Sequence, residues 1–424
     1  MVLVNKLTFT ISEYGLLGLD EAVKKYNSFL SVKLPEENGQ KIYNEFEAFA
    51  KTDYGKDILG FAGNGKYLQA KNYVGTIQTK NGCTLEILPK IYNFSDEKDE
   101  PREIFLELLR LLYKLPNYKH VERANFKNEK MPLLEIFITM FLIEVGAMIK
   151  KGIKSDYINQ EDNLYFLKGK FLINQQLKYN YIHKERFFVS YDEYSPNRAE
   201  NRLIKSTLKY LSKISKSYEN IRLIRLYQES MFNIEHSLNF DADFRACKTE
   251  TRGMNHYKTL LIWSKIFLKK ESFSSFSGDT IAFAILYPME KLFENYVEHY
   301  LIEKNLNLHV INQSAEKRFV SNDSKKKLFG VRPDFVIKDN DIVKVVADAK
   351  WKLLSKKHSF SQSDFYQLFA YNHIYTNENK QCIGLRLYYP MSEYLDKKKE
   401  FTYFDGTKIQ VIPLDMKDIV RDEN

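Results

Sequence analysis

The sequence predicts a multidomain α+β protein, and three observations support this fold class. The chain has 424 residues, of which 44% are apolar and 14% aromatic, enough for about two to four domains with real cores. Strand patterns dominate residues 1–115, helical patterns dominate residues 116–275, and residues 276–424 alternate helix and strand. We therefore expect a β-rich N-terminal domain, a helical middle domain and a C-terminal α/β domain with those boundaries.

The N-terminal region contains the clearest local signal in the chain. Two alternating runs, Val74–Gln78 and Thr84–Leu88, flank the dipeptide Asn81-Gly82. Asn-Gly between such runs is typical of a tight β-hairpin, because both residues tolerate positive φ. Apolar residues at helical spacing over Gly39–Lys51 predict a helix in the same region.

A glycine-rich segment nearby imitates a phosphate-binding loop. Residues Gly60–Lys66 satisfy the GxxxxGK part of that motif, but Tyr67 stands where a P-loop needs Ser or Thr to bind Mg²⁺. The following residues favour strand and turn over the helix whose N-terminus would face the phosphates. We interpret the segment as the turn of a hairpin.

The middle region is predicted to be mostly helical. Residues Met131–Lys150 are apolar nearly all round, which predicts a helix buried inside the protein. Glu135 and Glu144 argue against a membrane span. Ser195-Pro196-Asn197 is typical of a helix start, with Ser as the cap and Pro at the first helical position, and Thr259–Leu268 predicts a further helix.

Composition narrows the cellular setting and the partner. The chain opens without the basic start and apolar run of a signal peptide, so we expect a cytoplasmic protein. Its three cysteines form no CxxC pair, which argues against structural zinc. Net charge is +9, and residues 315–358 carry twelve Lys or Arg against six acids, so either a phosphate backbone or solvent can face that surface.

The segment Gly330–Lys352 carries the strongest functional signal. Pro333-Asp334 opens a short apolar strand, a charged turn follows, and a second strand ends in Asp348-Ala349-Lys350. Since side chains alternate along a strand, Asp348 and Lys350 share one face, and Asp334 lies at the start of the neighbouring strand. Two carboxylates and one ammonium group therefore meet at one edge of a sheet.

This trio of charges suits metal-assisted cleavage of a phosphodiester. Carboxylate oxygens are ligands that Mg²⁺ prefers, and Mg²⁺ usually takes only one or two protein carboxylates while keeping several waters. A metal held there can lower the pKa of an attacking water, and Lys350 can orient that water or offset charge on the phosphate. The alternative is a surface hairpin with scattered charge.

These residues resemble the PD-(D/E)xK nuclease superfamily, with Pro333-Asp334 and Asp348-Ala349-Lys350 filling its pattern. The resemblance implies an αβββαβ core, a glutamate brought to the metal by a preceding helix, and a Gln-x-x-x-Tyr-like signature on a following helix. Glu294, on the predicted helix Met289–Leu301, suits the first role, with Glu290 and Glu298 as alternatives or a surface position as its other reading.

The predicted helix Ser361–Tyr375 carries the second signature. Gln367 and Tyr371 lie at i and i+4, so their side chains share one helix face, where they can support the site or contact DNA. Core packing explains Tyr371 nearly as well. Lys352 can contact phosphate or remain a surface lysine, and we assign Trp351 to packing or base stacking.

Four phrases, in order along residues 70–375, resemble the McrC family, the nuclease subunit of McrBC-type restriction systems. Besides the nuclease motif they are Asn72–Gly75 with Leu85–Ile91, Asn197–Lys205 (NRAENRLIK) and Asn255-His256-Tyr257. The resemblance implies a hexameric AAA+ GTPase partner that recognises and translocates modified double-stranded DNA. It also implies that residues 1–115 dock on that ring and that its GTP hydrolysis is stimulated.

Two other functions stay open at this point. The chain could act mainly as a non-catalytic adaptor that activates the GTPase ring, or as a stand-alone nuclease of DNA repair. The first hypothesis is a Mg²⁺-dependent DNA endonuclease subunit with Asp334, Asp348, Lys350 and Glu294 in the site.

Overall fold

The computed structural model is a mixed α and β protein that divides into two compact units. One unit combines residues 1–119 with residues 277–424, and the other is residues 120–276. The division into three domains at residues 115 and 275 stays a prediction. The structure describes residues 7–26, 29–91, 100–115, 131–248, 254–268, 281–304, 309–312, 317–321, 327–339, 342–355, 359–379 and 384–421.

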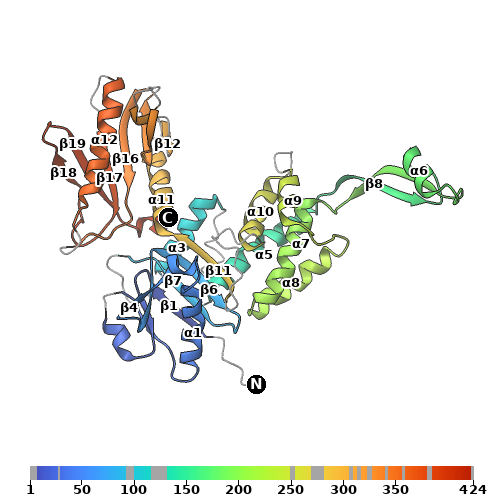
Figure 1. The fold of residues 1–424 in the computed structure, drawn as a ribbon, viewed down its shortest axis with the longest axis horizontal. Coiled ribbons are helices and arrows are strands. Elements are labelled where there is room, and N and C mark those ends of the chain that lie inside the picture. The colour runs from blue at the N-terminus through green and yellow to red at the C-terminus, as the bar shows by residue number, and fades with distance from the viewer. Residues whose placement is uncertain are drawn as a thin grey trace. The chain divides into compact units, whose positions relative to one another are not determined.

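The first unit contains a four-stranded sheet built from both ends of the chain (Figure 1). The sheet order is β1 (Thr8–Ser12), β7 (Thr84–Leu88), β6 (Tyr73–Thr79), β11 (Ile281–Pro288). Strands β6 and β7 form the predicted Asn-Gly hairpin, so that prediction is confirmed. Strand β11, from the C-terminal third of the sequence, completes the sheet by pairing with β6. Helix α3 (Glu100–Tyr113) packs against β7.

A smaller sheet accompanies it, in the order β3 (Val32–Lys33), β2 (Leu16–Gly18), β5 (Tyr67–Ala70), β4 (Leu59–Ala62). Around it lie η1 (Glu21–Lys25), the predicted helix α1 (Gly39–Ala50) and α2 (Gly55–Ile58). The GxxxxGK segment forms the turn between β4 and β5, with positive φ at Gly63, Asn64 and Gly65. The prediction of a hairpin turn there is confirmed.

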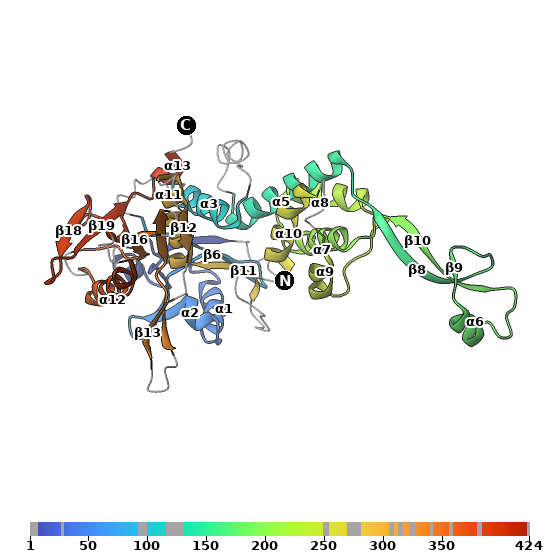
Figure 2. The ribbon, with the colours of Figure 1, turned by 90° about the horizontal axis from the view of Figure 1, so that it is seen from above.

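The same unit holds a six-stranded sheet with helices on both faces (Figure 2). Its order is β12 (His309–Asn312), β15 (Phe335–Asp339), β16 (Ile342–Ala349), β17 (Gly384–Pro390), β19 (Lys408–Leu414), β18 (Lys399–Thr402). Helix α11 (Met289–Lys304) precedes the sheet in the sequence, and α12 (Gln362–Asn379) lies between β16 and β17. A short helix, α13 (Asp418–Arg421), follows β19. A separate hairpin joins β13 (Lys317–Ser321) to β14 (Lys327–Val331).

The side chains of this sheet alternate between two helices. Val346 and Leu387 point to the face where α12 contributes Leu368 and Tyr371 to one buried core. Their neighbours along the strands point to the other face, where Tyr388 contacts Tyr300 of α11. Residues two positions from Val346 therefore face α12. The order of helix, strands, helix and strand matches the order predicted from the sequence.

The second unit consists of packed helices and a projecting β-arm, which Figure 2 shows extending away from α7. The helices are α5 (Leu133–Lys151), α7 (Ala199–Ile214), α8 (Tyr218–Ser230), α9 (Phe240–Ala246) and α10 (Asn255–Leu268). The arm, which the sequence analysis did not predict, consists of β8 (Asp156–Leu164), β9 (Lys170–Phe171), α6 (Ile173–Tyr179) and β10 (Phe187–Ser195).

Helix α5 is buried along most of its length, as its all-round apolar sequence predicts. Among the residues that the structure describes, no helix is both long and apolar enough to cross a membrane. The predicted helix start at Ser195-Pro196 is wrong. Strand pairing extends β10 to Ser195, opposite Asp156, so α7 begins at Ala199 with Arg198 as its N-cap.

Candidate active site

The three charged residues singled out in the sequence meet at one end of β15 and β16. Asp334 directly precedes β15, and its Oδ2 accepts a hydrogen bond from the backbone N of Ala349 at 2.8 Å. Asp348, near the end of β16, is 1% exposed. Lys350 follows β16, where its backbone N donates to the carbonyl of Tyr388 at 2.9 Å and its Nζ lies 2.5 Å from Oδ2 of Asp348.

Strand register explains why these residues converge. Phe335 pairs with Ala347, so the residues just outside that pair, Asp334 and Asp348, lie next to each other. Asp348 is two positions beyond Val346 and therefore shares its face with α12. The local sequence thus places two carboxylates and one ammonium group at the same sheet end.

Burial and a neighbouring negative charge raise the pKa of both carboxyl groups. Burial raises the pKa of Asp348 to about 7, and the negative charge of Asp334 adds to this. Burial also raises the pKa of Asp334, and the charge of Glu294 raises it further against the opposing hydrogen bond from Ala349. Burial alone would lower the pKa of Lys350, but the attraction of Asp348 outweighs it and the pKa is raised.

The donor set fits a hard divalent cation. Within the described residues, neither carboxylate oxygen of Asp348 accepts an aligned hydrogen bond, although the residue is buried and has only Lys350 as a close cation. A buried carboxylate of this kind is costly unless a cation or hydrogen bonds compensate it. No group of three or more His, Cys, Asp or Glu side chains able to hold a metal occurs in the described ranges. A metal here would therefore take the two aspartates and keep several waters, as Mg²⁺ does.

The three glutamates of α11 lie in different settings. Glu294 is partly buried, and its charge acts on Asp334. Glu290 accepts a hydrogen bond from Asn72 of the N-terminal region, and Glu298 accepts one from Asn312 at 2.8 Å. Of the three, Glu294 is therefore the one whose charge raises the pKa of Asp334.

Gln367 and Tyr371 hold the segment that leads into Asp334. Gln367 Nε2 donates to the hydroxyl of Tyr371 at 2.5 Å, and that hydroxyl donates to the carbonyl of Arg332 at 3.1 Å. Burial raises the pKa of Tyr371 to about 12, and the charges of Asp348 and Asp334 contribute. Both predicted residues therefore lie beside the site and fix its backbone.

Lys352 forms an ion pair with a residue that the sequence analysis missed. Its Nζ lies 2.9 Å from Oδ2 of Asp364, in the first turn of α12, and the Tyr389 hydroxyl donates to the same oxygen at 2.7 Å. The Lys352 side chain is 48% exposed, whereas that of Asp364 is 5% exposed. In the sequence Asp364 is indistinguishable from an ordinary acidic residue at a helix start.

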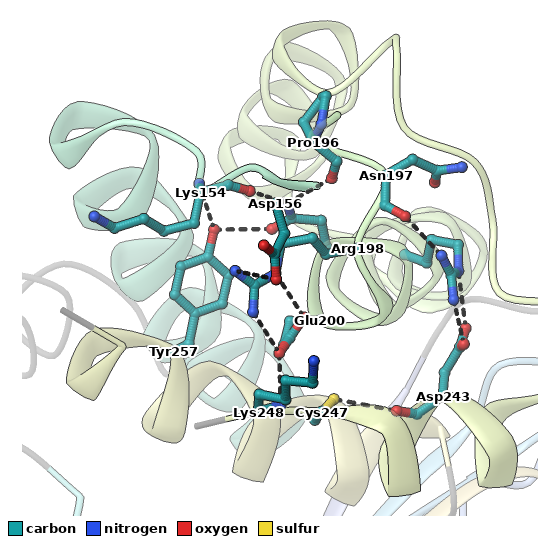
Figure 3. Close-up of polar contacts among 12 residues, drawn as sticks. Lys154, Asp156, Pro196, Asn197, Arg198, Glu200, Asp243, Cys247, Lys248 and Tyr257 are labelled. Carbon is teal, nitrogen blue, oxygen red and sulfur yellow. Dashed lines mark hydrogen bonds and ion pairs between the residues drawn. The ribbon is translucent and has the colours of Figure 1, made fainter. Parts of the chain in front are cut away.

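A second polar cluster lies at the base of the β-arm and contains the NRAEN and NHY phrases (Figure 3). The Tyr257 hydroxyl donates to Oδ1 of Asn201 at 2.8 Å and accepts from the backbone N of Lys154 at 3.1 Å. Asn201 Nδ2 donates to the carbonyls of Lys154 and Pro196 at 2.9 and 2.7 Å. These bonds tie both ends of the arm to α7 and α10.

Ion pairs complete this arm-base cluster, which we define as Lys154, Asp156, Arg198, Glu200, Asn201 and Tyr257. Arg198 binds both oxygens of Glu200 at 3.1 Å, and its Nη1 lies 3.7 Å from Oδ2 of Asp156. The first residue of β8 and the N-cap of α7 are thereby joined. The cluster therefore fixes where the arm leaves the helices.

Comparison with solved structures agrees with this fold. The chain superimposes on one from the refined half-complex of a tetradecameric assembly of Thermococcus gammatolerans McrB AAA+ hexamers with bound McrC, with a TM-score of 0.66, 18% identity and 98% coverage of both chains. A chain of the Thermococcus gammatolerans McrBC complex gives a TM-score of 0.51 at 19% identity, covering 70% of this chain and 88% of that one. No curated protein matches.

The sequence also matches a described protein family. Residues 68–390 match the family described as McrBC 5-methylcytosine restriction system component. The match covers most of the chain, which therefore belongs to this family, and the resemblance to McrC drawn from the sequence phrases is confirmed.

Proposed function

We propose that this chain is the Mg²⁺-dependent DNA endonuclease subunit of a McrBC-type restriction complex. The observation that carries the proposal is the buried Asp348 beside Asp334 and Lys350, a carboxylate pair with one lysine at the end of a mixed sheet. Apart from the separate β13–β14 hairpin between β12 and β15, the order α11, β12, β15, β16, α12, β17 suits the αβββαβ core of a PD-(D/E)xK nuclease. Membership of the restriction family supports the same function.

The residues divide the chemistry among them. Asp334 and Asp348 would hold Mg²⁺, with Glu294 supporting through its charge or a bound water. Bound Mg²⁺ would supply charge stabilisation and a more acidic water. Lys350 remains protonated at neutral pH, since its pKa is raised, and its ammonium group can orient a water or offset charge on the phosphate.

The partner in this proposal is a hexameric AAA+ GTPase. The similar solved structures contain McrB AAA+ hexamers with McrC. The β-arm of this chain exposes apolar side chains over its outer part, which is typical of a protein docking surface. Those with more than half of their surface exposed include Tyr165, Phe166, Leu167, Ile173, Tyr181 and Ile182.

In this complex the partner would recognise modified double-stranded DNA and translocate it, and the chain would stimulate its GTP hydrolysis. A docking role for the arm adds to the role predicted for residues 1–115. The exposed arm also favours the second candidate, a mainly non-catalytic adaptor of the ring. The two candidates differ only in whether Asp348 and its neighbours cut DNA.

Substitution of Asp348 separates these functions. The chain is assembled with the AAA+ protein that accompanies it in its host, and is given methylated DNA, Mg²⁺ and GTP. We expect Asp348→Ala to lower the cleavage rate at least about 100-fold, with GTP turnover by the partner unchanged. Asp339→Ala is the matched control, because Asp339 ends β15 with a half-exposed side chain.

Undiminished cleavage by Asp348→Ala would sink the nuclease proposal. Stimulated GTP turnover without cleavage by the wild-type complex would favour the adaptor. Cleavage by the chain alone, without GTP, would favour the stand-alone nuclease.

A further inference from the structure

A buried hydrogen bond joins the catalytic strand to the N-terminal sheet. Trp351, which directly follows Lys350, is 4% exposed, and its Nε1 donates to both carboxylate oxygens of Glu13, at 3.0 and 3.1 Å. Glu13 is 0% exposed and directly follows β1. The two residues are 338 positions apart in the sequence, so the contact is a product of the tertiary fold.

The N-terminal sheet holds Glu13 firmly. Its backbone N donates to the carbonyl of Leu88 at 2.9 Å, and its Oε2 accepts from the backbone N of Lys90 at 3.1 Å. The ammonium group of Lys90 lies 4.3 Å from the centre of the Tyr14 ring and 5.8 Å from that of Trp351. The carboxylate therefore accepts hydrogen bonds both from Lys90, just after β7 of the N-terminal sheet, and from Trp351, just after β16.

The helix that carries Glu294 is also attached to the N-terminal sheet. Strand β11 belongs to the N-terminal sheet and continues directly into α11, where the backbone N of Met289 donates to the carbonyl of Asn72 at 2.9 Å. On α11 the ring of Phe293, next to Glu294, lies 5.4 Å from that of Trp351. Trp351 thus contacts both Glu13 and the helix that carries Glu294.

This arrangement bears on where the Lys350 ammonium group lies. Its backbone is fixed on one side by Tyr388, and the next side chain along the chain is fixed by Glu13. A displacement of about 1 Å in a group that must meet a reacting atom can cost about 100-fold in rate. A buried carboxylate is also a costly way to pack two sheets together, since apolar residues of similar volume are often as stable.

We propose that Glu13 is a positioning residue for the nuclease site, acting through Trp351 on Lys350. The inference rests on the proposed nuclease function. It makes the N-terminal sheet part of the cutting machinery, because the end of β16 and the start of α11 are both anchored to that sheet.

The test compares two buried carboxylates of the same sheet. Glu13→Gln keeps the shape but replaces one of the two oxygens that accept from Trp351 Nε1 with an NH₂ group, which can only donate and would face that donor. Glu86→Gln is the matched control, because Glu86 is also 0% exposed and its ion pair is with Arg102 rather than with the nuclease strand. Both variants are assembled with the AAA+ partner and assayed on methylated DNA.

We expect Glu13→Gln to lower the maximal cleavage rate about 10- to 100-fold, with the DNA concentration for half-maximal rate and the partner's GTP turnover unchanged. Glu86→Gln should keep the wild-type rate at a temperature where both variants are folded. Trp351→Phe, which keeps the ring and removes the donor, should match Glu13→Gln. The double variant should lose no more than either one alone.

Tryptophan fluorescence reports on the contact between Trp351 and Glu13 without a cleavage assay. The chain has two tryptophans, so Trp263→Phe leaves Trp351 as the sole reporter. Its emission should shift on Glu13→Gln but not on Glu86→Gln.

The outcomes distinguish this inference from the proposed function. A wild-type complex that does not cut overturns both. A cutting wild type with equal rates for Glu13→Gln and Glu86→Gln overturns the positioning role alone, as would additive losses in the double variant.

Discussion

The two polar clusters of this protein have similar residue types but opposite states of satisfaction. In the arm-base cluster the Tyr257 hydroxyl both donates and accepts, and Asn201 Nδ2 donates twice. At the sheet end, Asp348 is as buried as Asn201, yet neither of its oxygens accepts an aligned hydrogen bond from the described residues. The first cluster is complete within the protein, and the second has capacity for a ligand.

This difference separates a structural role from a chemical one. A buried network whose members are all paired rigidifies the fold, whereas an underpaired buried charge raises the free energy of the folded state. The free-energy cost of burying Asp348 is expected where a cation or substrate compensates its charge during function. The family phrases at residues 197–205 and 255–257 therefore lie at an architectural joint, while Pro333-Asp334 and Asp348-Ala349-Lys350 carry the residues of the proposed nuclease site.

Removing the ammonium group that pairs with Asp348 should have the largest effect. We expect Lys350→Ala to lower the cleavage rate about 100- to 1,000-fold, because this group lies 2.5 Å from Oδ2 of Asp348 and can offset charge on the phosphate. Steady-state cleavage of methylated DNA by the assembled complex measures this. Lys344→Ala is the control, because Lys344 lies in the same strand with a side chain that is 43% exposed. Equal rates for the two variants would contradict a chemical role for Lys350.

Glu13 is a buried carboxylate that accepts hydrogen bonds, so it tests whether such bonds offset the free-energy cost of burying a charge. Burial raises its pKa from 4.5 to about 7, against the opposing effect of Lys90. The folded state then binds more protons than the unfolded chain between these values, so stability should fall as the pH rises from 4.5 to 7. The loss should be about 3 kcal/mol, and Glu13→Gln should remove it. Melting temperatures across that pH range measure the difference, and parallel curves would contradict the assignment.

Neutralising Asp348 should stabilise the metal-free protein. Asp348→Asn keeps the shape and removes a buried charge next to Asp334, which should raise the free energy of unfolding by on the order of 2 kcal/mol at pH 8. Thermal unfolding in chelator measures this. Adding Mg²⁺ should stabilise the wild type but not the variant, since only the wild type gains binding energy in the folded state. A destabilised variant would mean that Lys350 already compensates the charge.

Local patterns predicted the elements whose signals are local. The Asn-Gly hairpin and the α1 helix formed as the sequence indicated, and so did the strands of the 330–352 segment, because their turn residues and periodicity are decided by neighbours. The convergence of Asp334, Asp348 and Lys350 followed from period-2 geometry alone. Nothing in the structure tests their metal ligation, which stays a prediction.

Long-range pairing was beyond those patterns. Glu13 resembles any acidic turn residue, and only the folded sheet brings Trp351 to it. Pairing with β8 extended β10 through Ser195 and overrode a good capping sequence. The outer part of the arm is rich in apolar residues, among them Tyr165, Phe166 and Leu167, a composition that favours burial rather than the exposure that the structure shows.

The smallest effect is expected at the complete cluster. Tyr257→Phe leaves the backbone N of Lys154 and Oδ1 of Asn201 without their partner in a buried setting, which should cost about 1 to 2 kcal/mol of stability. Thermal unfolding of the chain measures it, and Tyr194→Phe is the control because Tyr194 lies exposed on the arm. The intrinsic chemistry at Asp348 should not change. Asp348→Asn should stabilise the protein and Tyr257→Phe should destabilise it, although both residues are buried. That result would establish that hydrogen-bond pairing, rather than burial, decides whether substituting a buried polar residue raises or lowers the free energy of unfolding. An unchanged melting temperature for Tyr257→Phe would refute this conclusion.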